Sequence, residues 1–147
     1  MALSDLSANA QDYLKVIWGL QEWSDTHVTP STIARRAGVR PSTASGAIAK
    51  LAEHGLIEHA PYGEVTLTDQ GRTYAIEMTR RHRLIETFLL QILGYSLEEV
   101  HAEAEHLEHS ASDLMVQRID ALLGHPERDP HGDPIPRADG TVPVQVA

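Results

Sequence analysis

A helix–turn–helix–hairpin block, residues 29–68, is the feature that most constrains how this 147-residue chain can fold. Pro and Ser/Thr residues open two short helical patterns, residues 30–38 and 41–55, and a glycine closes each of them. Two β-prone runs follow, residues 56–60 and 65–68, around a Pro/Gly turn that is typical of a hairpin. A hairpin directly after a helix-turn-helix predicts a winged helix.

Apolar residues at helical spacing predict four further helices, over residues 7–23, 69–93, 97–107 and 113–123. The predicted fold class is therefore mainly α. An N-terminal winged helix-turn-helix is expected in residues 1–72, followed by an all-helical domain in residues 73–140. Helical periodicity is lost after residue 125, and residues 141–147 are expected to be a tail.

The net charge of −9 argues at first against a nucleic-acid partner, but the charge is unevenly distributed. Residues 30–83 carry a balance of +3, while the remainder of the chain carries −12. A basic winged helix beside an acidic, histidine-containing domain is the pattern that this partition indicates. No apolar run approaches the length of a membrane span and no signal peptide is visible, so the expected location is the cytoplasm.

The second helix of the helix-turn-helix is the expected DNA-reading element, because its first turn would enter the major groove. Small hydroxyl and apolar side chains there suit contacts with phosphates and thymine methyl groups, and the basic residues around them suit phosphate contacts. The alternative is that the hydroxyl residues only cap the helix. The candidate DNA-binding residues are Arg35, Arg36, Arg40, Pro41, Ser42, Thr43, Ser45, Gly46, Lys50 and, at the tip of the wing, Tyr62.

A second dense signal is a run of carboxylates and imidazoles over residues 101–109. Glu105, Glu108 and His109 are spaced to share one face of a helix, and His101 lies one turn before Glu105. Because one helix cannot surround an ion, other helices must contribute ligands. The candidates are the i, i+4 pair His82 and Glu86, and Asp12 on the first helix.

The ligand chemistry of this set is hard oxygen plus imidazole, since the chain has no cysteine. That favours Mn(II) or Fe(II) over thiolate-bound zinc or copper(I). The alternative is a solvated acidic helix face, which repulsion between neighbouring carboxylates makes costly without a cation. The remaining histidines lack such a pattern and are expected at the surface: His27, His54, His59, His125 and His131.

The order of these motifs resembles the diphtheria-toxin-repressor family of metal-dependent transcriptional repressors. The resemblance rests on the winged helix, the run Arg-Arg-His82-Arg-Leu-Ile-Glu86, the residues 101–109 and the run Asp-Pro-His-Gly-Asp-Pro-Ile-Pro at 129–136. It implies that the helical domain after the wing is a dimerisation and metal-binding domain. It further implies a homodimer that binds palindromic double-stranded operator DNA and represses metal-uptake genes.

The resemblance also assigns the candidate ligands. It implies a primary metal site at Asp12, Glu105, Glu108 and His109, and an ancillary site at His82, Glu86 and His101. Iron-responsive members carry Met and Cys in the places of Asp12 and Glu105, so the carboxylates here resemble manganese-responsive members. Mn(II) is the expected cofactor and Fe(II) the alternative, with Co(II), Ni(II), Zn(II) or Cd(II) as substitutes. The C-terminal β-barrel of many members is expected to be absent.

Three rival interpretations stay open at this point. The first is an Fe(II)-responsive repressor of iron uptake, and the second is a winged-helix regulator that senses an organic ligand. The third is a metalloenzyme, which would need an open coordination position beside a substrate cleft. The sequence has no phosphate-binding glycine loop and no nucleophile motif, so we expect a protein that is not an enzyme.

Overall fold

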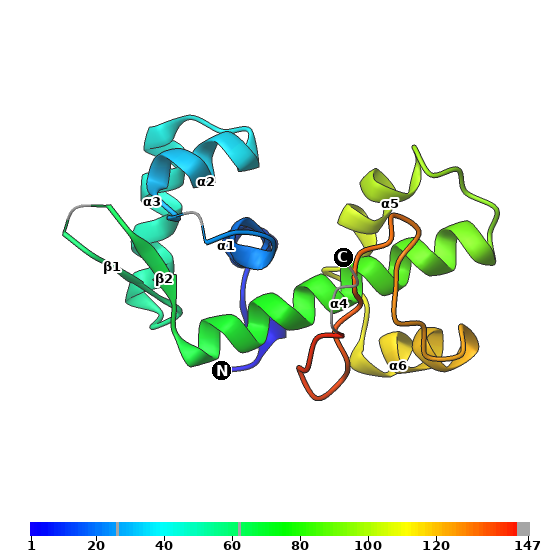
Figure 1. Ribbon diagram of the computed structural model, residues 1–147. Helices are drawn as coiled ribbons and strands as arrows, with labels where there is room; N and C mark the ends of the chain where they lie inside the picture. Colours follow the sequence, from blue (N-terminus) through cyan, green and yellow to red (C-terminus); the bar gives the residue numbers. More distant parts are fainter. Residues whose placement is uncertain (26, 62, 144–147) are drawn as a thin grey trace. The chain divides into compact units, whose positions relative to one another are not determined.

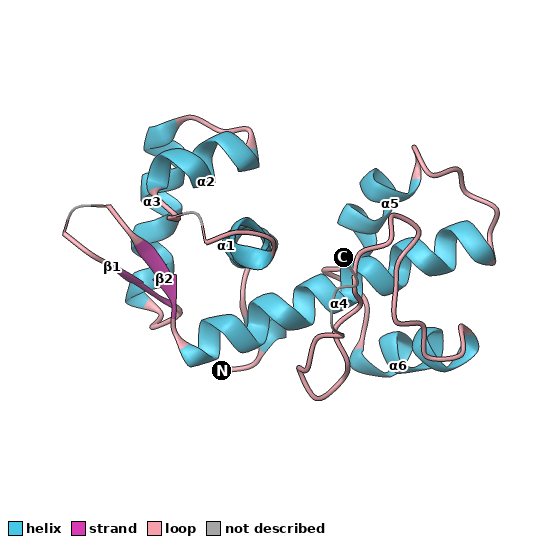
Figure 2. Ribbon diagram, in the orientation of Figure 1, coloured by secondary structure: helices cyan, strands magenta, loops and turns pink. Residues whose placement is uncertain are grey.

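The computed structural model describes residues 1–25, 27–61 and 63–143, and it divides into two compact units, residues 1–76 and 77–147 (Figure 1). Six α-helices and a two-stranded sheet form the described fold (Figure 2), which confirms the predicted mainly α class. A short 3-10 helix, Leu3–Asp5, precedes them. None of the described helices is both long enough and apolar enough to cross a membrane.

The helix-turn-helix in the first unit begins and ends where local capping chemistry dictates. Helix α1 spans Ala8–Glu22, α2 spans Pro30–Ala37 and α3 spans Pro41–Glu53. The Thr29 hydroxyl accepts from the Thr32 amide at the start of α2. Gly38 ends that helix in the left-handed region, with φ 71°. These caps confirm the predicted turn between α2 and α3.

The predicted wing is an antiparallel pair of strands, β1 (Ile57–His59) and β2 (Val65–Leu67). Ile57 pairs with Leu67 at its base, and Val65 donates its amide to the carbonyl of Val28 at 2.8 Å. The hydrogen bond from Val65 to Val28 connects the wing to the segment before α2. Tyr62 lies outside the described residues, so its predicted role at the wing tip stays a prediction.

The second unit is built on the C-terminal half of α4, which spans Asp69–Gln91. Helix α5 spans Val100–Leu107 and α6 spans Asp113–Leu122. All three helices and the loop after α6 supply residues to one apolar core: Leu84, Ile85, Leu89, Val100, Ala104, Val116, Ile119 and Ile135. This packing holds the candidate ligands on α4, α5 and the loop in fixed positions relative to one another.

Helix α5 begins three residues later than the sequence predicts. The amide of Ser96 donates to the Glu99 carboxylate at 2.8 Å, and the amide of Glu99 donates to the Ser96 carbonyl at 3.0 Å. These bonds form a turn over residues 96–99, and the Ser96 carbonyl also accepts from the Val100 amide at 3.2 Å, so the turn leads directly into the helix. Apolar spacing therefore marks the start of this helix to within about one helical turn, because the turn and the helix share the Ser96 carbonyl as an acceptor.

Candidate metal centre

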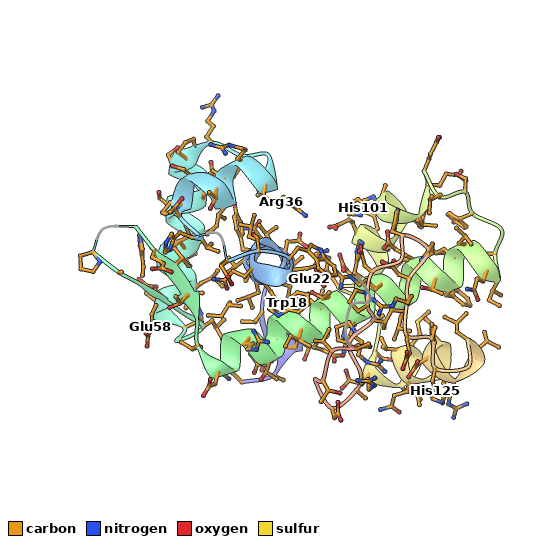
Figure 3. The ribbon with its side chains drawn as sticks, viewed as in Figure 1. Trp18, Glu22, Arg36, Glu58, His101 and His125 are labelled. Atoms are coloured by element: carbon orange, nitrogen blue, oxygen red, sulfur yellow. The ribbon has the colours of Figure 1, made fainter. Side chains whose placement is uncertain are left out.

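Helix α4 places His82 and Glu86 one turn apart on the same buried face. The His82 Nε2 and Glu86 Oε1 atoms lie 3.4 Å apart. Helix α5 brings His101 (Figure 3) to the same place, with its Nδ1 atom 3.7 Å from Glu86 Oε2. The three predicted ancillary ligands thus gather around Glu86, and any two of their candidate ligand atoms lie within 4.8 Å of each other.

The last turn of α5 and the residues after it carry Glu105, Glu108 and His109. Glu108 is fully buried, and its Oε1 atom lies 4.0 Å from His109 Nε2. We call these three residues the Glu108 cluster. The fourth predicted primary ligand, Asp12, belongs to α1 in the first unit, and its participation stays a prediction.

Two more candidate ligands, Asp129 and His131, come from the loop after α6. His131 Nδ1 lies 3.9 Å from Glu86 Oε1, and Asp129 belongs to the same group within 4.8 Å. The sequence predicts His131 as a surface residue without a partner. Its side chain is indeed 40% exposed, but its position beside Glu86 makes it a candidate ligand. We call His82, Glu86, His101, Asp129 and His131 the Glu86 cluster.

A local signal for this loop exists in the sequence. One carboxylate oxygen of Asp129 accepts from the amides of His131 and Asp133, both at 2.9 Å. An Asp that accepts from amides two and four residues ahead is a turn-forming device, and the Asp-Pro-His-Gly-Asp run is typical of it. The turn alone does not reveal that Glu86, more than forty residues earlier, lies beside it.

Two arginines of α4 hold the ligand-bearing loop against the helix. Arg83 Nη1 donates to the Pro134 carbonyl at 2.8 Å, and Arg80 Nη1 donates to the Pro136 carbonyl at 3.2 Å. Arg80 also contacts Asp120 of α6 at 3.3 Å. Because Pro134 follows His131 by three residues, the Arg83 hydrogen bond fixes the part of the loop that presents His131 to Glu86.

We expect Arg83→Gln to weaken Mn(II) binding at the Glu86 cluster by about tenfold, the lower end of effects seen for supporting residues at metal sites. The variant loses the hydrogen bond to Pro134 and leaves every candidate ligand in the chain. Titration with Mn(II), followed through the resonance of the free ion, measures the change. Arg137→Gln is the matched control, since Arg137 is an exposed residue near the same loop that contacts Glu127. Equal affinities in the two variants would contradict a positioning role for Arg83.

The pKa values of the two buried carboxyls in the Glu86 cluster are shifted in opposite directions. Burial alone would raise the pKa of Glu86, but the hydrogen bond with His82 and the nearby histidine charges outweigh it and hold that pKa below its ordinary value. Burial raises the pKa of Asp129, against two amide hydrogen bonds that lower it, and the charges of Asp133 and Glu86 raise it further. The cluster therefore holds an ionised Glu86 beside a carboxyl that favours a proton or a cation.

The residues of the Glu86 cluster fit a divalent cation. Glu86 Oε2 is buried and has no hydrogen-bond partner among the described residues, which is costly for a carboxylate oxygen unless a cation binds it. Bonds of about 2.1 Å would place neighbouring octahedral ligand atoms about 3.0 Å apart and opposite ones about 4.2 Å apart. The histidine nitrogens lie 3.4 to 3.9 Å from the Glu86 oxygens, within that interval.

The candidate DNA-contact residues on α2, α3 and the turn between them are all exposed where the structure describes them. The predicted residues at 35, 36, 40–43, 45, 46 and 50 lie at the surface of the first unit, and Figure 3 shows Arg36 on α2. Ala44, Ile48 and Leu51 occupy the opposite, buried face of α3. This division leaves the predicted reading face free for a ligand, and DNA contact itself stays a prediction.

Comparison with known proteins agrees with a winged helix followed by a ligand-bearing helical domain. Residues 5–65 match the family description "Iron dependent repressor, N-terminal DNA binding domain". Residues 68–137 match "Iron dependent repressor, metal binding and dimerisation domain". The two matches define a class of DNA-binding regulators with a separate metal-binding domain. The chain belongs to the iron-dependent repressor family, which includes the diphtheria toxin repressor.

Individual relatives extend the likeness across most of the chain. The iron-dependent repressor IdeR of Mycobacterium leprae is 36% identical over 136 residues, which are 91% of this chain and 58% of the relative. A solved manganese-dependent transcriptional repressor in complex with manganese is 61% identical, with a TM-score of 0.86 over 92% of this chain and 62% of that one. The manganese regulator SloR is 37% identical, with a TM-score of 0.83 over 95% and 64%. The chain thus spans about three-fifths of the length of these relatives.

Proposed function

We propose that this protein is a metal-dependent transcriptional repressor of metal-uptake genes, activated by Mn(II) for binding to palindromic operator DNA as a homodimer. One observation carries the proposal: buried Glu86, Asp129 and His82 and the exposed imidazoles of His101 and His131 converge from α4, α5 and the loop, in a family of DNA-binding repressors. The described clusters contain nitrogen and oxygen donors and no sulfur, which suits Mn(II) and Fe(II).

Manganese is favoured over iron by the ligand set and by the relatives. Asp12 and Glu105 are carboxylates at the two positions where iron-responsive members of the resembled family carry Met and Cys. The solved relative at 61% identity is described as manganese-dependent, whereas the iron-dependent repressor IdeR of Mycobacterium leprae is 36% identical. Cd(II) and Zn(II) are bound to ScaR, a relative that is 39% identical, so these ions are expected substitutes here.

The proposed activation joins the two units of the chain. Asp12 belongs to the first unit, and the Glu108 cluster belongs to the second. A bound cation would supply two positive charges and bonds to ligands of both units. Asp12 would then fix α1, and with it the winged helix, relative to the dimerisation domain. The same charges would offset part of the acidic excess that repels DNA.

The homodimer is supported by the distribution of exposed apolar side chains. Seven of the nine large hydrophobic residues that are exposed in the described chain belong to the second unit, which matches the dimerisation domain of the family. They are Ile92, Leu93, Leu97, Leu107, Leu114, Met115 and Leu122. A dimerisation surface in this unit would cover some of these side chains.

Metal-titrated DNA binding tests the proposal. The protein is incubated with genomic fragments in Mn(II), in Fe(II) under anaerobic conditions and in chelator, and the bound fragments are sequenced and then titrated. We expect palindromic fragments to be retained in Mn(II) and released in chelator. Equal retention in all three conditions would overturn metal activation, and a stronger response to Fe(II) would replace manganese by iron.

We expect Asp12→Ala to weaken metal activation of DNA binding more than His101→Ala. Asp12 is the proposed ligand that connects the units, whereas His101 is a 68% exposed member of the Glu86 cluster. The ratio of operator affinities in Mn(II) and in chelator measures the activation of each variant. A larger loss in His101→Ala would place the activating cation at the Glu86 cluster instead.

A further inference from the structure

We propose that His82 couples the two clusters, so that a cation bound at Glu86 orients Glu108 for a second cation. The inference rests on the proposed function, because it requires that both clusters bind metal. It concerns one side chain that contacts both. His82 is buried, and each of its ring nitrogens faces a carboxylate of a different cluster.

The distances around the imidazole define these two directions. His82 Nε2 lies 3.4 Å from Glu86 Oε1. On the other side of the ring, His82 Nδ1 lies 3.2 Å from Glu108 Oε2 and 3.7 Å from Glu105 Oε1. The ring of His101 meets the His82 ring edge to face, with centroids 4.9 Å apart, and restricts its rotation. His101 Nε2 also lies 3.6 Å from Glu105 Oε1, so the two clusters meet at two imidazole rings, of which His82 is the buried one.

A neutral imidazole has one N–H and one lone pair, so the use of one nitrogen decides the role of the other. If Nε2 gives its lone pair to a cation at Glu86, the hydrogen must be on Nδ1. Its nearest carboxylate oxygen in the Glu108 cluster is Glu108 Oε2. A metal-binding histidine that donates its second nitrogen to a carboxylate is a common arrangement, and it fixes the orientation of both groups.

The two oxygens of Glu108 can serve different partners in this arrangement. Oε2 faces His82, while Oε1 lies 4.0 Å from His109 Nε2. A hydrogen bond from His82 to Oε2 would hold the carboxylate with Oε1 directed at His109, which is the pair that a second cation needs. The first cation would thus remove part of the cost of ordering the second site.

Repulsion between two cations opposes this effect, but the clusters carry compensating charge. The Glu86 cluster contains two carboxyls, Glu86 and Asp129, and the Glu108 cluster contains another two, Glu105 and Glu108. Each pair balances the charge of one divalent ion. We therefore expect the orientation of Glu108 to dominate, which gives positive coupling, and linkage makes that coupling equal in both directions.

Mn(II) titrations of the full chain, followed by the resonance of the free ion, measure the coupling. His109→Ala leaves only the Glu86 cluster able to bind tightly, and His101→Ala combined with His131→Ala leaves only the Glu108 cluster. These variants give the two separate dissociation constants. The titration of the unmodified chain then gives the factor by which one bound ion raises the affinity for the other. The same set is repeated with His82→Gln and with His106→Gln.

The His82→Gln substitution separates ligation from coupling. A glutamine places its terminal amide near the position of Nε2, so it can still approach Glu86, but it has no donor at the position of Nδ1. We expect a coupling factor of about ten in the unmodified chain, equivalent to about 1.4 kcal/mol, and a factor near one in His82→Gln. His106 is an exposed histidine on α5 outside both clusters, so His106→Gln is expected to keep the factor of ten.

The outcomes distinguish failure of the coupling role of His82 from failure of metal-dependent repression. A factor near one in the unmodified chain, or an equal factor in His82→Gln, would overturn the coupling role of His82 and leave metal-dependent repression intact. Absence of Mn(II) binding in the unmodified chain would overturn both. Loss of coupling in His106→Gln as well as in His82→Gln would assign the effect to α5 in general and would overturn the specific role.

Discussion

Glu108→Ala is expected to abolish metal activation: operator affinity in Mn(II) should fall by about 100-fold, equivalent to about 2.7 kcal/mol, to the level in chelator. Glu108 is fully buried and contacts His82 on one side and His109 on the other. Its removal deletes a ligand of the proposed activating site and the proposed acceptor for His82 Nδ1. Both losses would weaken the proposed connection of the helical domain to the winged helix.

The measurement is a titration of operator DNA in Mn(II) and in chelator, with circular dichroism to verify folding. Glu103→Ala is the matched control, because Glu103 is a carboxylate on α5, the helix that ends directly before Glu108, and it belongs to neither cluster. We expect that control to keep its response to Mn(II). If Glu108→Ala responds as strongly as the control, the Glu108 cluster does not activate the protein.

The parts of the fold that could be predicted are those that depend on neighbours in sequence. Ser7 and Thr29 cap α1 and α2 through hydrogen bonds within three residues, and Gly38 ends α2 through its own backbone conformation. These signals act over one helical turn and are therefore visible in the sequence. The start of α5 is less sharply marked, because the turn over residues 96–99 leads into the helix through the same Ser96 carbonyl.

The candidate site also has features that depend on neighbours in sequence and features that depend on long-range packing. The spacing of His82 and Glu86 places both on one face of α4, which is a local property. The predicted helix face of Glu105, Glu108 and His109 differs from the structure, because α5 ends at Leu107 and the last two of these residues follow in a turn. The approach of Asp129 and His131 to Glu86 depends on the burial of Ile135 and on the hydrogen bonds from Arg80 and Arg83 to loop carbonyls. Such long-range packing has no periodic signal in a single sequence.

The sharing of His82 between the clusters shows a further limit of motif reading. The resemblance assigns His82 to one site and Glu108 to another, as though each ligand served one ion. In the structure the His82 ring faces carboxylates of both groups, at 3.4 Å and 3.2 Å. The His82 ring therefore lies between the two predicted sites, and in the proposed coupling a change at one site reaches the other through this ring.

Gly71→Ala is expected to destabilise the first unit by about 3 kcal/mol or more, because helix α4 begins in direct contact with the backbone before β1. A Cβ atom at residue 71 would lie 1.9 Å from the carbonyl oxygen of Leu56. That oxygen also accepts from the Thr68 amide at 3.1 Å, and the Thr68 hydroxyl donates to the Gly55 carbonyl at 2.8 Å. The obstacle is hydrogen-bonded backbone, so relief of the clash requires the wing and α4 to separate.

Denaturant unfolding in chelator measures the loss without a contribution from bound metal. Gly19→Ala is the matched control, since a Cβ atom there would meet nothing within 4 Å in the described structure. It should be neutral or stabilising by up to about 1 kcal/mol, because alanine favours a helix interior over glycine. If Gly71→Ala unfolds at the same denaturant concentration as Gly19→Ala, the close packing of α4 on the Leu56 backbone does not support the winged helix.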